Sequence, residues 1–572
     1  MSFRRLIQIL CLVVFLFSLA SVASLILPLS NPDLFLRFDP VIFIGTVISG
    51  RTFSFVYIPA IIVILLAPFF GRIFCGYICP MGTTIDETDR LINSPGKKTV
   101  QIDRHLRSIK YYVLFFILGA ALLGVSFVFL GSPISLIARF YGLVIYPMLS
   151  FLASLGVQIV MPLAEKFDIY SIVFAKIPTP RFATQLFILV FFIAIFAAVR
   201  ISPRFWCRFI CPSGAILALF SMRPLYRRQV SEDCTNCGKC VKSCPTAAIS
   251  QDDPGSSSHS ECIVCKTCEE ICPVDAVRFS AEKADRNPAG EPVNSPERRR
   301  FLVSGLAGFG TATVNLTGLN SLYGKQGIGQ VAPHDLLRPP GSIPEMDFLA
   351  KCVRCGECMV ACPNNVLQPI WTQAGFAAIF SPGFVPRRGK CDPSCTNCGD
   401  VCPTFAIRSL PRKERIWARS GTATIIKNLC LAWEHKKKCM VCDEVCPFGA
   451  IEFNYVEGNP VSVPEITEDK CAGCGYCEHH CPVQNKAAII VTPMGGLRMA
   501  EGSFKEEGMK LGMNISIKPK DETGYPSDED PSYGTAPGFD ADFSESAELG
   551  FDDPYSDVDE PEDGQAPGFD VE

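Results

Sequence analysis

The stretch "CTNCGKCVKSCP" (residues 234–245) places four cysteines at intervals of two, two and three residues and ends in Cys-Pro. A second stretch with the same spacing, "CIVCKTCEEICP" (residues 262–273), follows, and 17 residues separate Cys244 from Cys262. A loop with this spacing curls around one face of a cubane cluster and presents three thiolates and several backbone N–H groups to it. Zinc is usually bound by two short motifs that each supply two ligands. The spacing therefore predicts two [4Fe–4S] clusters.

The duplicated stretch is the bacterial two-cluster ferredoxin pattern, in which the fourth cysteine of each stretch reaches the other cluster. We expect the first cluster to be held by Cys234, Cys237, Cys240 and Cys272. We expect the second cluster to be held by Cys262, Cys265, Cys268 and Cys244. The apolar stretch 276–280 indicates a closing strand, so residues 229–282 are predicted to form a compact α+β ferredoxin domain.

The region before this domain predicts a polytopic α-helical membrane domain over residues 1–228. Four apolar runs come close to the roughly 20 residues that a spanning helix needs; they are residues 5–27, 53–73, 109–131 and 183–202. Basic residues gather before the first run, between the second and third, and after the fourth, so these three regions are expected to be cytoplasmic. Four crossings follow. A fifth run, 138–162, is interrupted by Arg139 and prolines, which favours a re-entrant or interfacial segment.

Two related motifs, "GRIFCGYICPMG" (71–82) and "RFWCRFICPSG" (204–214), close the second and fourth runs. Each contains Cys-x3-Cys-Pro, and the topology above predicts that their cysteines lie together at the cytoplasmic face. One hypothesis is a single four-thiolate redox or metal site, and the alternative is a pair of helix ends with proline in the first turn. The candidate ligands are Cys75, Cys79, Cys207 and Cys211. Only Cys11 stands apart from all cysteine groups, and it is interpreted as a packing residue.

The stretch "SPERRRFLVSGLAGFG" (295–310) has the adjacent arginines and weakly apolar run of a twin-arginine export signal. We expect residues 283–300 to be a linker that carries this motif, and residues 301–323 to be a membrane or export segment. Because this pathway carries folded cargo, a domain could receive its clusters in the cytoplasm before it crosses. The alternative is a basic cluster flanking an ordinary helix, which would leave every cluster in the cytoplasm.

Four further cysteine groups follow the arginines within residues 340–495, and they predict a second, four-cluster ferredoxin-like domain. Sixteen ligands are enough for four clusters, which gives six [4Fe–4S] clusters in the chain. The sixteen cysteines are Cys352, Cys355, Cys358, Cys362, Cys391, Cys395, Cys398, Cys402, Cys430, Cys439, Cys442, Cys446, Cys471, Cys474, Cys477 and Cys481.

Other features exclude several classes of function. The chain has no Cys-x-x-Cys-His motif for covalent haem c and no glycine-rich nucleotide-binding motif, and we expect no nucleic-acid partner. Residues 521–572 contain 18 acidic residues and no Lys or Arg, so this tail is expected to be disordered. The tail is either a solvated extension or a docking strip for a basic redox protein such as a multihaem c-type cytochrome.

Residues 1–285 resemble the membrane quinol dehydrogenase subunit NapH, and residues 297–495 resemble the NapG/MauM ferredoxin-type subunit. The second resemblance includes the distinctive "CLAWEHKKKCMVCDEVCP" (430–447). The resemblance implies oxidation of quinol in the bacterial cytoplasmic (inner) membrane, in contact with lipid and the quinol pool. It also implies that the two-cluster domain is cytoplasmic, and that the four-cluster domain is periplasmic and delivers electrons to a cytochrome or reductase there. No catalytic acid or base can be named.

The same resemblance implies a cluster pairing in the four-cluster domain, in which the first cysteine group pairs with the fourth and the second with the third. The implied ligand sets are Cys352, Cys355, Cys358 and Cys481; Cys471, Cys474, Cys477 and Cys362; Cys391, Cys395, Cys398 and Cys446; and Cys430, Cys439, Cys442 and Cys402. The membrane half also resembles the regulator NosR and the oxidase-assembly protein CcoG. An assembly factor that supplies electrons or handles metal for a respiratory enzyme is therefore the alternative function.

Overall fold

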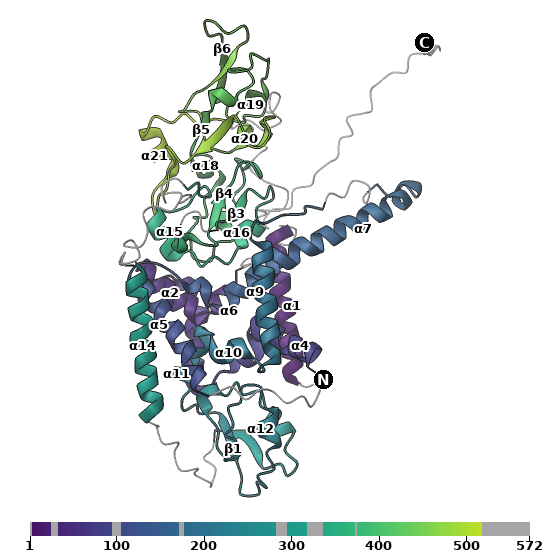
Figure 1. Ribbon diagram of the computed structural model, residues 1–572, viewed down its shortest axis with the longest axis vertical. Helices are drawn as coiled ribbons and strands as arrows, with labels where there is room; N and C mark the ends of the chain where they lie inside the picture. Colours follow the sequence, from purple (N-terminus) through teal and green to yellow (C-terminus); the bar gives the residue numbers. More distant parts are fainter. Residues whose placement is uncertain are drawn as a thin grey trace, which may run out of the picture.

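The computed structural model describes residues 3–24, 33–93, 104–170, 177–281, 295–316, 336–371 and 375–517. A body of helices lies between two cysteine-rich units (Figure 1). The unit built from residues 227–280 lies at one end of the helical body, and the unit built from residues 336–517 lies at the opposite end. We call them the two-cluster unit and the four-cluster unit. The acidic tail lies outside the described residues.

The helical body is made of apolar helices, several of which begin with a proline directly after a turn. Proline suits the first helical position because that residue has no intrahelical partner for an N–H; it opens α2, α4, α6 and α11. The helices are α1 (Phe3–Ser24), α2 (Pro40–Gly50), α3 (Ile58–Phe70), α4 (Pro80–Ile92), α5 (Ile109–Leu122), α6 (Pro133–Phe140), α7 (Tyr146–Lys166), α9 (Gln185–Ala197), α10 (Phe205–Phe209), α11 (Pro212–Phe220) and α14 (Ser295–Leu316).

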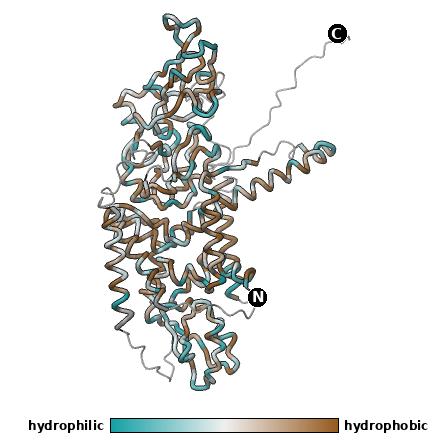
Figure 2. Tube along the Cα trace, viewed as in Figure 1, coloured by the Kyte–Doolittle hydropathy of each residue, from teal (hydrophilic) through white to brown (hydrophobic). Residues whose placement is uncertain are grey.

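The helical body is apolar outside as well as inside. Figure 2 shows mainly hydrophobic residues along these helices and more hydrophilic residues in the cysteine-rich units. Large apolar side chains such as Leu10, Leu65 and Leu186 are exposed on its outer face. By length and composition, two described helical stretches could cross a membrane, Phe3–Ala23 and Pro133–Lys166, and α3 and α9 belong to shorter apolar stretches.

The fifth apolar run differs from our expectation of an interrupted segment. Residues 133–166 are helical throughout, because α6 continues through a π-helical turn (Tyr141–Ile145) into α7. Pro147 directly follows the π-helical turn and does not interrupt the helix. The run is therefore one continuous helix, and its re-entrant or interfacial position stays a prediction. Beyond the π-helical turn, α7 projects away from the body (Figure 1).

The segment that carries the arginines is part of a helix and not of a linker. Helix α14 begins at Ser295 and packs lengthwise against α5. A Cβ on Gly308 would lie 2.7 Å from the backbone oxygen of Tyr112, so only glycine allows this close approach. The Tyr112 hydroxyl also donates to Thr311 Oγ1 at 3.0 Å. Figure 1 shows α14 running beside the body from the side of the two-cluster unit toward the four-cluster unit.

The two-cluster unit is a small α+β fold. Strand β1 (Arg227–Val230) pairs antiparallel with β2 (Val277–Ser280), so the two ends of this unit close on each other. The helices α12 (Lys239–Ser243) and α13 (Thr267–Glu270) each contain the third cysteine of a cluster loop. Apolar side chains from both strands form a core together with cysteines of both loops.

The four-cluster unit contains three antiparallel strand pairs, with the first pair nearer to the helical body (Figure 1). These are β3 (Leu367–Pro369) with β4 (Pro382–Phe384), β5 (Thr422–Ile425) with β8 (Ile489–Thr492), and β6 (Ile451–Asn454) with β7 (Val463–Ile466). Its helices are α15 (Glu345–Lys351), α16 (Glu357–Val360), α17 (Asn397–Asp400), α18 (Arg412–Arg415), α19 (Val441–Glu444), α20 (Tyr476–His480) and α21 (Phe504–Lys510). The unit extends past the expected end at residue 495, because Phe504 of α21 is buried in its core.

Candidate iron–sulfur sites

Four cluster loops share one backbone conformation. In each Cys-x2-Cys-x2-Cys loop, the residues directly before and after the second cysteine have positive φ. A non-glycine residue in this left-handed region costs of order 1–2 kcal/mol, so such strain persists where the surrounding structure requires it. The two residues with positive φ turn the chain around the second cysteine. The residue pairs are Asn236 and Gly238, Val264 and Lys266, Arg354 and Gly356, and Gly473 and Gly475.

In the two-cluster unit, the second set of cysteines surrounds a cavity of about 350 Å³. Backbone N–H groups point at the sulfur atoms: Ala248 donates to Cys244 Sγ at 3.3 Å and Val264 donates to Cys262 Sγ at 3.4 Å. Cys244 comes from the first stretch, as the spacing predicts. The cysteines that line this cavity are Cys244, Cys262, Cys265 and Cys268.

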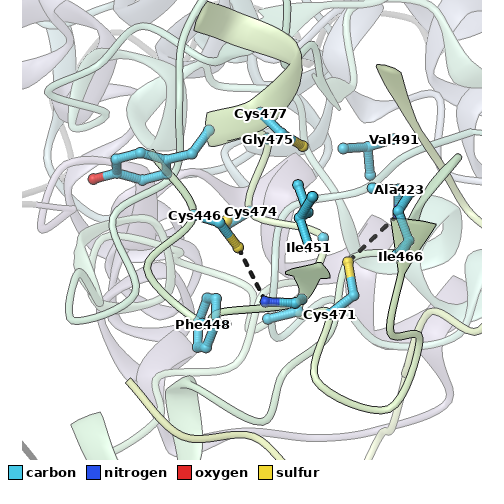
Figure 3. A pocket seen from close by; sticks show the side chains of 14 residues that line it. Ala423, Cys446, Phe448, Ile451, Ile466, Cys471, Cys474, Gly475, Cys477 and Val491 are labelled. Carbon is cyan, nitrogen blue, oxygen red and sulfur yellow. Dashed lines mark hydrogen bonds between the residues drawn. The ribbon is translucent and has the colours of Figure 1, made fainter. Parts of the chain in front are cut away.

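Two further cavities lie in the half of the four-cluster unit that is distant from the helical body. The first has a volume of about 350 Å³ and is lined by Cys446, Cys471, Cys474 and Cys477 (Figure 3). Ala450 N–H donates to Cys446 Sγ at 3.4 Å, and Ala423 N–H donates to Cys471 Sγ at 3.5 Å. The second has a volume of about 400 Å³ and is lined by Cys430, Cys439, Cys442 and Cys481.

The half of the four-cluster unit near the body brings its first two cysteine groups together. Cys402 of the second group is an electrostatic neighbour of Cys352 and Cys355, and its sulfur accepts the Ile407 N–H at 3.5 Å. Cys362 of the first group is in turn a neighbour of Cys395 and the other cysteines of the second group. The fourth cysteines are therefore exchanged between adjacent groups.

The pairing that the resemblance implied for the four-cluster unit is wrong. The structure pairs the first group with the second and the third with the fourth. Each pair of adjacent cysteine groups packs as its own two-cluster half. The spacing within one group does not determine which other group supplies the fourth cysteine of its cluster. The ligand sets become Cys352, Cys355, Cys358 and Cys402; Cys391, Cys395, Cys398 and Cys362; Cys430, Cys439, Cys442 and Cys481; and Cys471, Cys474, Cys477 and Cys446.

The residues present fit iron–sulfur clusters. Among the described residues, no three His, Cys, Asp or Glu side chains are close enough together to hold one metal ion. Cysteines that bind different corners of a cubane stand further apart, and the cavities with N–H groups aimed at sulfur suit such a group. Burial raises the pKa of Cys262 and of Cys442 to about 12. These thiols therefore need a bound cation to become thiolates.

The two-cluster unit docks on the helical body through the loop between Cys262 and Cys265. The Glu261 carboxylate accepts from Arg72 Nη1 at 3.1 Å and forms a second ion pair with Lys110. Burial alone would raise the pKa of Glu261, but the two cations hold it at about 2, so the carboxylate stays charged. Tyr77 donates its hydroxyl to Val264 O at 3.1 Å, and a Cβ on Gly76 would overlap the backbone oxygen of Ile263.

The four-cluster unit docks at the opposite end through its corresponding loop, between Cys352 and Cys355. The Ser135 hydroxyl donates to Val353 O at 2.8 Å. Arg354 donates to the backbone oxygen of Ser126 and lies over the ring of Phe129, with its guanidinium carbon 4.1 Å from the ring centroid. Equivalent loops of the two units therefore contact opposite ends of the helical body.

Two of the Cys-x3-Cys-Pro cysteines are buried and two are partly exposed. Cys79 and Cys211 belong to the buried core of the helical body, each one residue before the proline that opens α4 or α11. All four thiols are electrostatic neighbours of one another. The structure therefore brings the two motifs together, with Cys79 and Cys211 in the protein core, and the position of the four cysteines at the cytoplasmic face stays a prediction.

Comparison with known protein families identifies cluster-binding domains in separate segments between residues 52 and 485. Models described as a 4Fe-4S dicluster domain match residues 226–274 and 437–485. Models described as a 4Fe-4S binding domain match residues 348–368 and also residues 52–94 and 184–230, which include the Cys-x3-Cys-Pro motifs. The fold and its cysteine-lined cavities thus define a ferredoxin-type protein with several [4Fe–4S] clusters.

The chain is similar to named ferredoxin-type proteins. It is 37% identical over 207 residues to the methylamine utilization ferredoxin-type protein MauM of Methylorubrum extorquens, covering 35% of this chain and 90% of the relative. It is 31% identical over 273 residues to the ferredoxin-type protein NapG of Haemophilus influenzae, covering 44% of this chain and 90% of the relative. The chain belongs to this MauM and NapG family of ferredoxin-type proteins, although these matches leave more than half of it uncovered.

Sequence reasoning missed the charged residues that connect the sites. Arg72 and Arg204 each precede the first cysteine of a Cys-x3-Cys-Pro motif by three residues, and Glu261 directly precedes a cluster cysteine. The repeated Arg-x2-Cys spacing could have indicated the arginines. Nothing in the sequence could have paired Glu261 with Arg72, because that contact spans 189 residues.

Proposed function

We propose that this protein is a membrane-bound iron–sulfur electron-transfer protein that oxidises quinol and passes electrons to a redox partner outside the cytoplasmic membrane. The observation that carries the proposal is the position of the two cysteine-rich units at opposite ends of an apolar helical body. Each unit presents its equivalent cluster loop to that body. Residues 1–285, which resemble NapH, include the two-cluster unit and the helices of the body other than α14, and the relatives MauM and NapG cover 35% and 44% of the chain.

Helix α14 supports the idea that the chain crosses between its two ferredoxin units. It carries Arg299 and Arg300 in its first turns, and it lies alongside α5 over the height of the body (Figure 1). Small residues such as Gly305 and Gly308 face α5, which is how helices pack closely in a membrane. The same segment would therefore serve first as an export signal and then as a membrane helix.

The surface of the body supports contact with lipid. Apolar side chains are exposed around α1, α3 and α9, and a large exposed apolar surface marks a protein or membrane contact. The α7 arm is apolar around most of its circumference, with Leu149, Phe151 and Ile159 exposed. A helix that is apolar on all sides suits a lipid environment.

This chain contributes to the reaction by positioning the clusters. Bound [4Fe–4S] clusters supply one-electron transfer at potentials that their surroundings adjust. Backbone N–H groups aimed at cysteine sulfurs, and arginines such as Arg415, whose Nη2 lies 2.9 Å from Cys391 Sγ, stabilise added negative charge at these positions. The cysteine loops where the two units contact the helical body hold a cluster-binding segment of each unit against that body.

The first test is the side of the membrane on which the four-cluster unit lies. Protease added to spheroplasts should remove a tag fused after residue 572, while a tag inserted into the loop near Asp253 should stay protected. Protection of both tags would contradict export. Control spheroplasts opened with detergent should lose both tags.

The second test is reduction by quinol. Reduced quinol added to membranes containing the protein should produce electron paramagnetic resonance signals of reduced clusters, and membranes without the protein should not. Export without quinol-dependent reduction would contradict quinol oxidation and favour the assembly role, in which the chain supplies electrons or metal to a respiratory enzyme.

A further inference from the structure

The two Cys-x3-Cys-Pro motifs are parts of a longer repeat, Arg-x2-Cys-x3-Cys-Pro-x-Gly, which begins at Arg72 and again at Arg204. In the structure each arginine crosses to the other copy. Arg72 Nη2 lies 2.6 Å from the position that a Cβ on Gly214 would take, and Arg204 Nη1 donates to the backbone oxygen of Cys75 at 2.9 Å. Arg204 also lies 3.6 Å from the Cβ position of Gly82. The two copies therefore interlock as one unit with approximate two-fold symmetry.

The thiols of this unit are enclosed in the protein. Cys79 is 6% exposed and Cys211 is 5% exposed, so neither sulfur is available to a soluble partner. Cys211 Sγ accepts the Gly214 N–H at 3.3 Å, the same kind of contact that the cluster cysteines make in the ferredoxin units. Cys75 and Cys207, which are partly exposed, complete the set.

The charges that surround the thiols are unbalanced. Arg72 belongs to a buried network in which it and Lys110 share the single carboxylate of Glu261. Arg204 belongs to a second network in which it and Arg4 share the single carboxylate of Asp86. Among the described residues, each network therefore has one cation in excess, while the buried carboxylate of Asp39, which accepts from Ser213 and Ser132, lies near Cys79 and offsets part of that excess. Four thiolates around a doubly charged metal core would carry two net negative charges, which the remaining cations of the site would stabilise.

We propose that Cys75, Cys79, Cys207 and Cys211 together hold a seventh iron–sulfur cluster inside the helical body. The site differs from the six ferredoxin sites, because its ligands come from two symmetric helix ends and two crossed arginines lie beside it. The family model that covers both motifs is described as 4Fe-4S binding, but it assigns no ligands and does not join the two segments into one site.

The position of this site suits a relay between the two ferredoxin units. On one side, the Gly76 backbone between Cys75 and Cys79 contacts the loop between Cys262 and Cys265. Because these loops touch, no other element separates the four-thiol site from the second cluster of the two-cluster unit.

On the other side, a buried chain of hydrogen bonds leads from the four-thiol site to the four-cluster unit. Ser213, two residues after Cys211, donates to Asp39, which also accepts from Ser132 at 2.6 Å. Ser132 Oγ accepts the Ser135 N–H at 3.1 Å, and Ser135 donates to Val353 O in the loop that begins at Cys352. One electron received from one unit and released to the other requires no proton or further reactant. This relay role rests on the proposed transmembrane electron transfer, whereas the metal site does not.

The test is the iron and acid-labile sulfide content of the full-length protein purified in detergent. We expect the wild-type chain to hold seven clusters, and we expect Cys79→Ser and Cys211→Ser each to lose about four irons and four sulfides per chain. The control is Cys11→Ser, which removes the one cysteine outside all groups and should lose none. Electron paramagnetic resonance should show that the six ferredoxin signals persist in each variant.

Two results would overturn the proposal. The first is unchanged iron and sulfide in both variants, with the four thiols recovered as free thiols or disulfides. The second is one zinc ion per wild-type chain that disappears in both variants. If the buried substitutions prevent folding, Cys75→Ser, at a partly exposed ligand, gives the same readout, and unchanged iron there would also overturn the site.

The metal content also separates this inference from the proposed function. If the chain holds seven clusters but its four-cluster unit is protected from protease, the metal site is supported and its role as a relay is contradicted. If the chain holds six clusters, and its four-cluster unit is exported and its clusters are reduced by quinol, the proposed function is supported and the seventh site is contradicted.

Discussion

The two ferredoxin units dock on the helical body with equivalent loops, yet they balance buried charge in different ways. Where the two-cluster unit contacts the helical body, at the two-cluster dock, the cations Arg72 and Lys110 have a carboxylate partner in Glu261. The four-cluster dock is the corresponding contact of the four-cluster unit. At the four-cluster dock, Arg139 and Arg354 are buried beside the cysteines of the first cluster. Within the part of the chain that the structure describes, neither of these two guanidiniums has a carboxylate in ion-pair contact.

This difference indicates how each dock depends on its cluster. The two-cluster dock has one carboxylate for its two cations, so it should depend less on the adjacent cluster. The four-cluster dock has aromatic rings and backbone oxygens around its arginines, including Phe129 and Phe380. The missing negative charge there would come from cluster thiolates, so this dock should form fully only with the cluster in place.

The largest expected effect comes from removing the carboxylate of the two-cluster dock. Glu261→Gln leaves two buried cations without a partner, which should destabilise this dock by about 3–5 kcal/mol. Hydrogen exchange of residues 227–280 in the detergent-solubilised protein should become faster by a corresponding factor. Glu270→Gln, at an exposed position of the same unit, is the matched control and should change little. Equal exchange rates in both variants would show that the ion pairs do not hold the dock.

The next effect tests the dependence on clusters directly. Cys355→Ser and Cys265→Ser each remove the second cysteine of a docking loop. Loss of the first cluster of the four-cluster unit should weaken its dock by about 1–3 kcal/mol, because buried charged groups lose their compensation. Loss of the cluster at Cys265 should leave the Glu261 ion pairs in place. Limited proteolysis of the two docks should therefore respond asymmetrically, and an equal response would remove the distinction between them.

A steric comparison should give an intermediate effect. Gly76→Ala places a methyl group against the rigid backbone oxygen of Ile263, whereas Gly142→Ala places one 2.9 Å from a side-chain methyl of Val360, which can shift. We expect about 1–3 kcal/mol of destabilisation for the first variant and less for the second, measured from urea unfolding of each purified protein. The reverse order would mean that the two-cluster loop is the more adaptable of the two.

The smallest effect should come from a single neutral hydrogen bond. Ser135→Ala removes the donor to Val353 O and should cost about 1 kcal/mol at the four-cluster dock. The control is Thr313→Ala on the exposed side of α14, where the hydroxyl bonds within its own helix. Hydrogen exchange of residues 352–355 should respond to the first variant and not to the second. A cost near that of Glu261→Gln would mean that neutral bonds hold this dock as strongly as ion pairs hold the other.

The sequence alone determined the local parts of this protein. Spacing predicted 24 cysteine ligands in the ferredoxin units, and the family comparison identifies 4Fe-4S domains that contain all of them except Cys391, Cys395, Cys398, Cys402 and Cys430. It also predicted that Cys244 serves the second cluster of the two-cluster unit, which the cavity there supports. These features were predictable because three ligands and the left-handed residues between them lie within seven consecutive positions, where chain geometry leaves few alternatives.

Only the tertiary structure decided the features that depend on distant contacts. The exchange of Cys362 and Cys402, the burial of Cys79 and Cys211, and the pairing of Arg72 with Glu261 all join residues from different elements. No local preference distinguishes one partner cysteine from another with the same spacing. Which groups meet is decided when apolar helices and loops pack together, because burial fixes which thiols and charges must share a site.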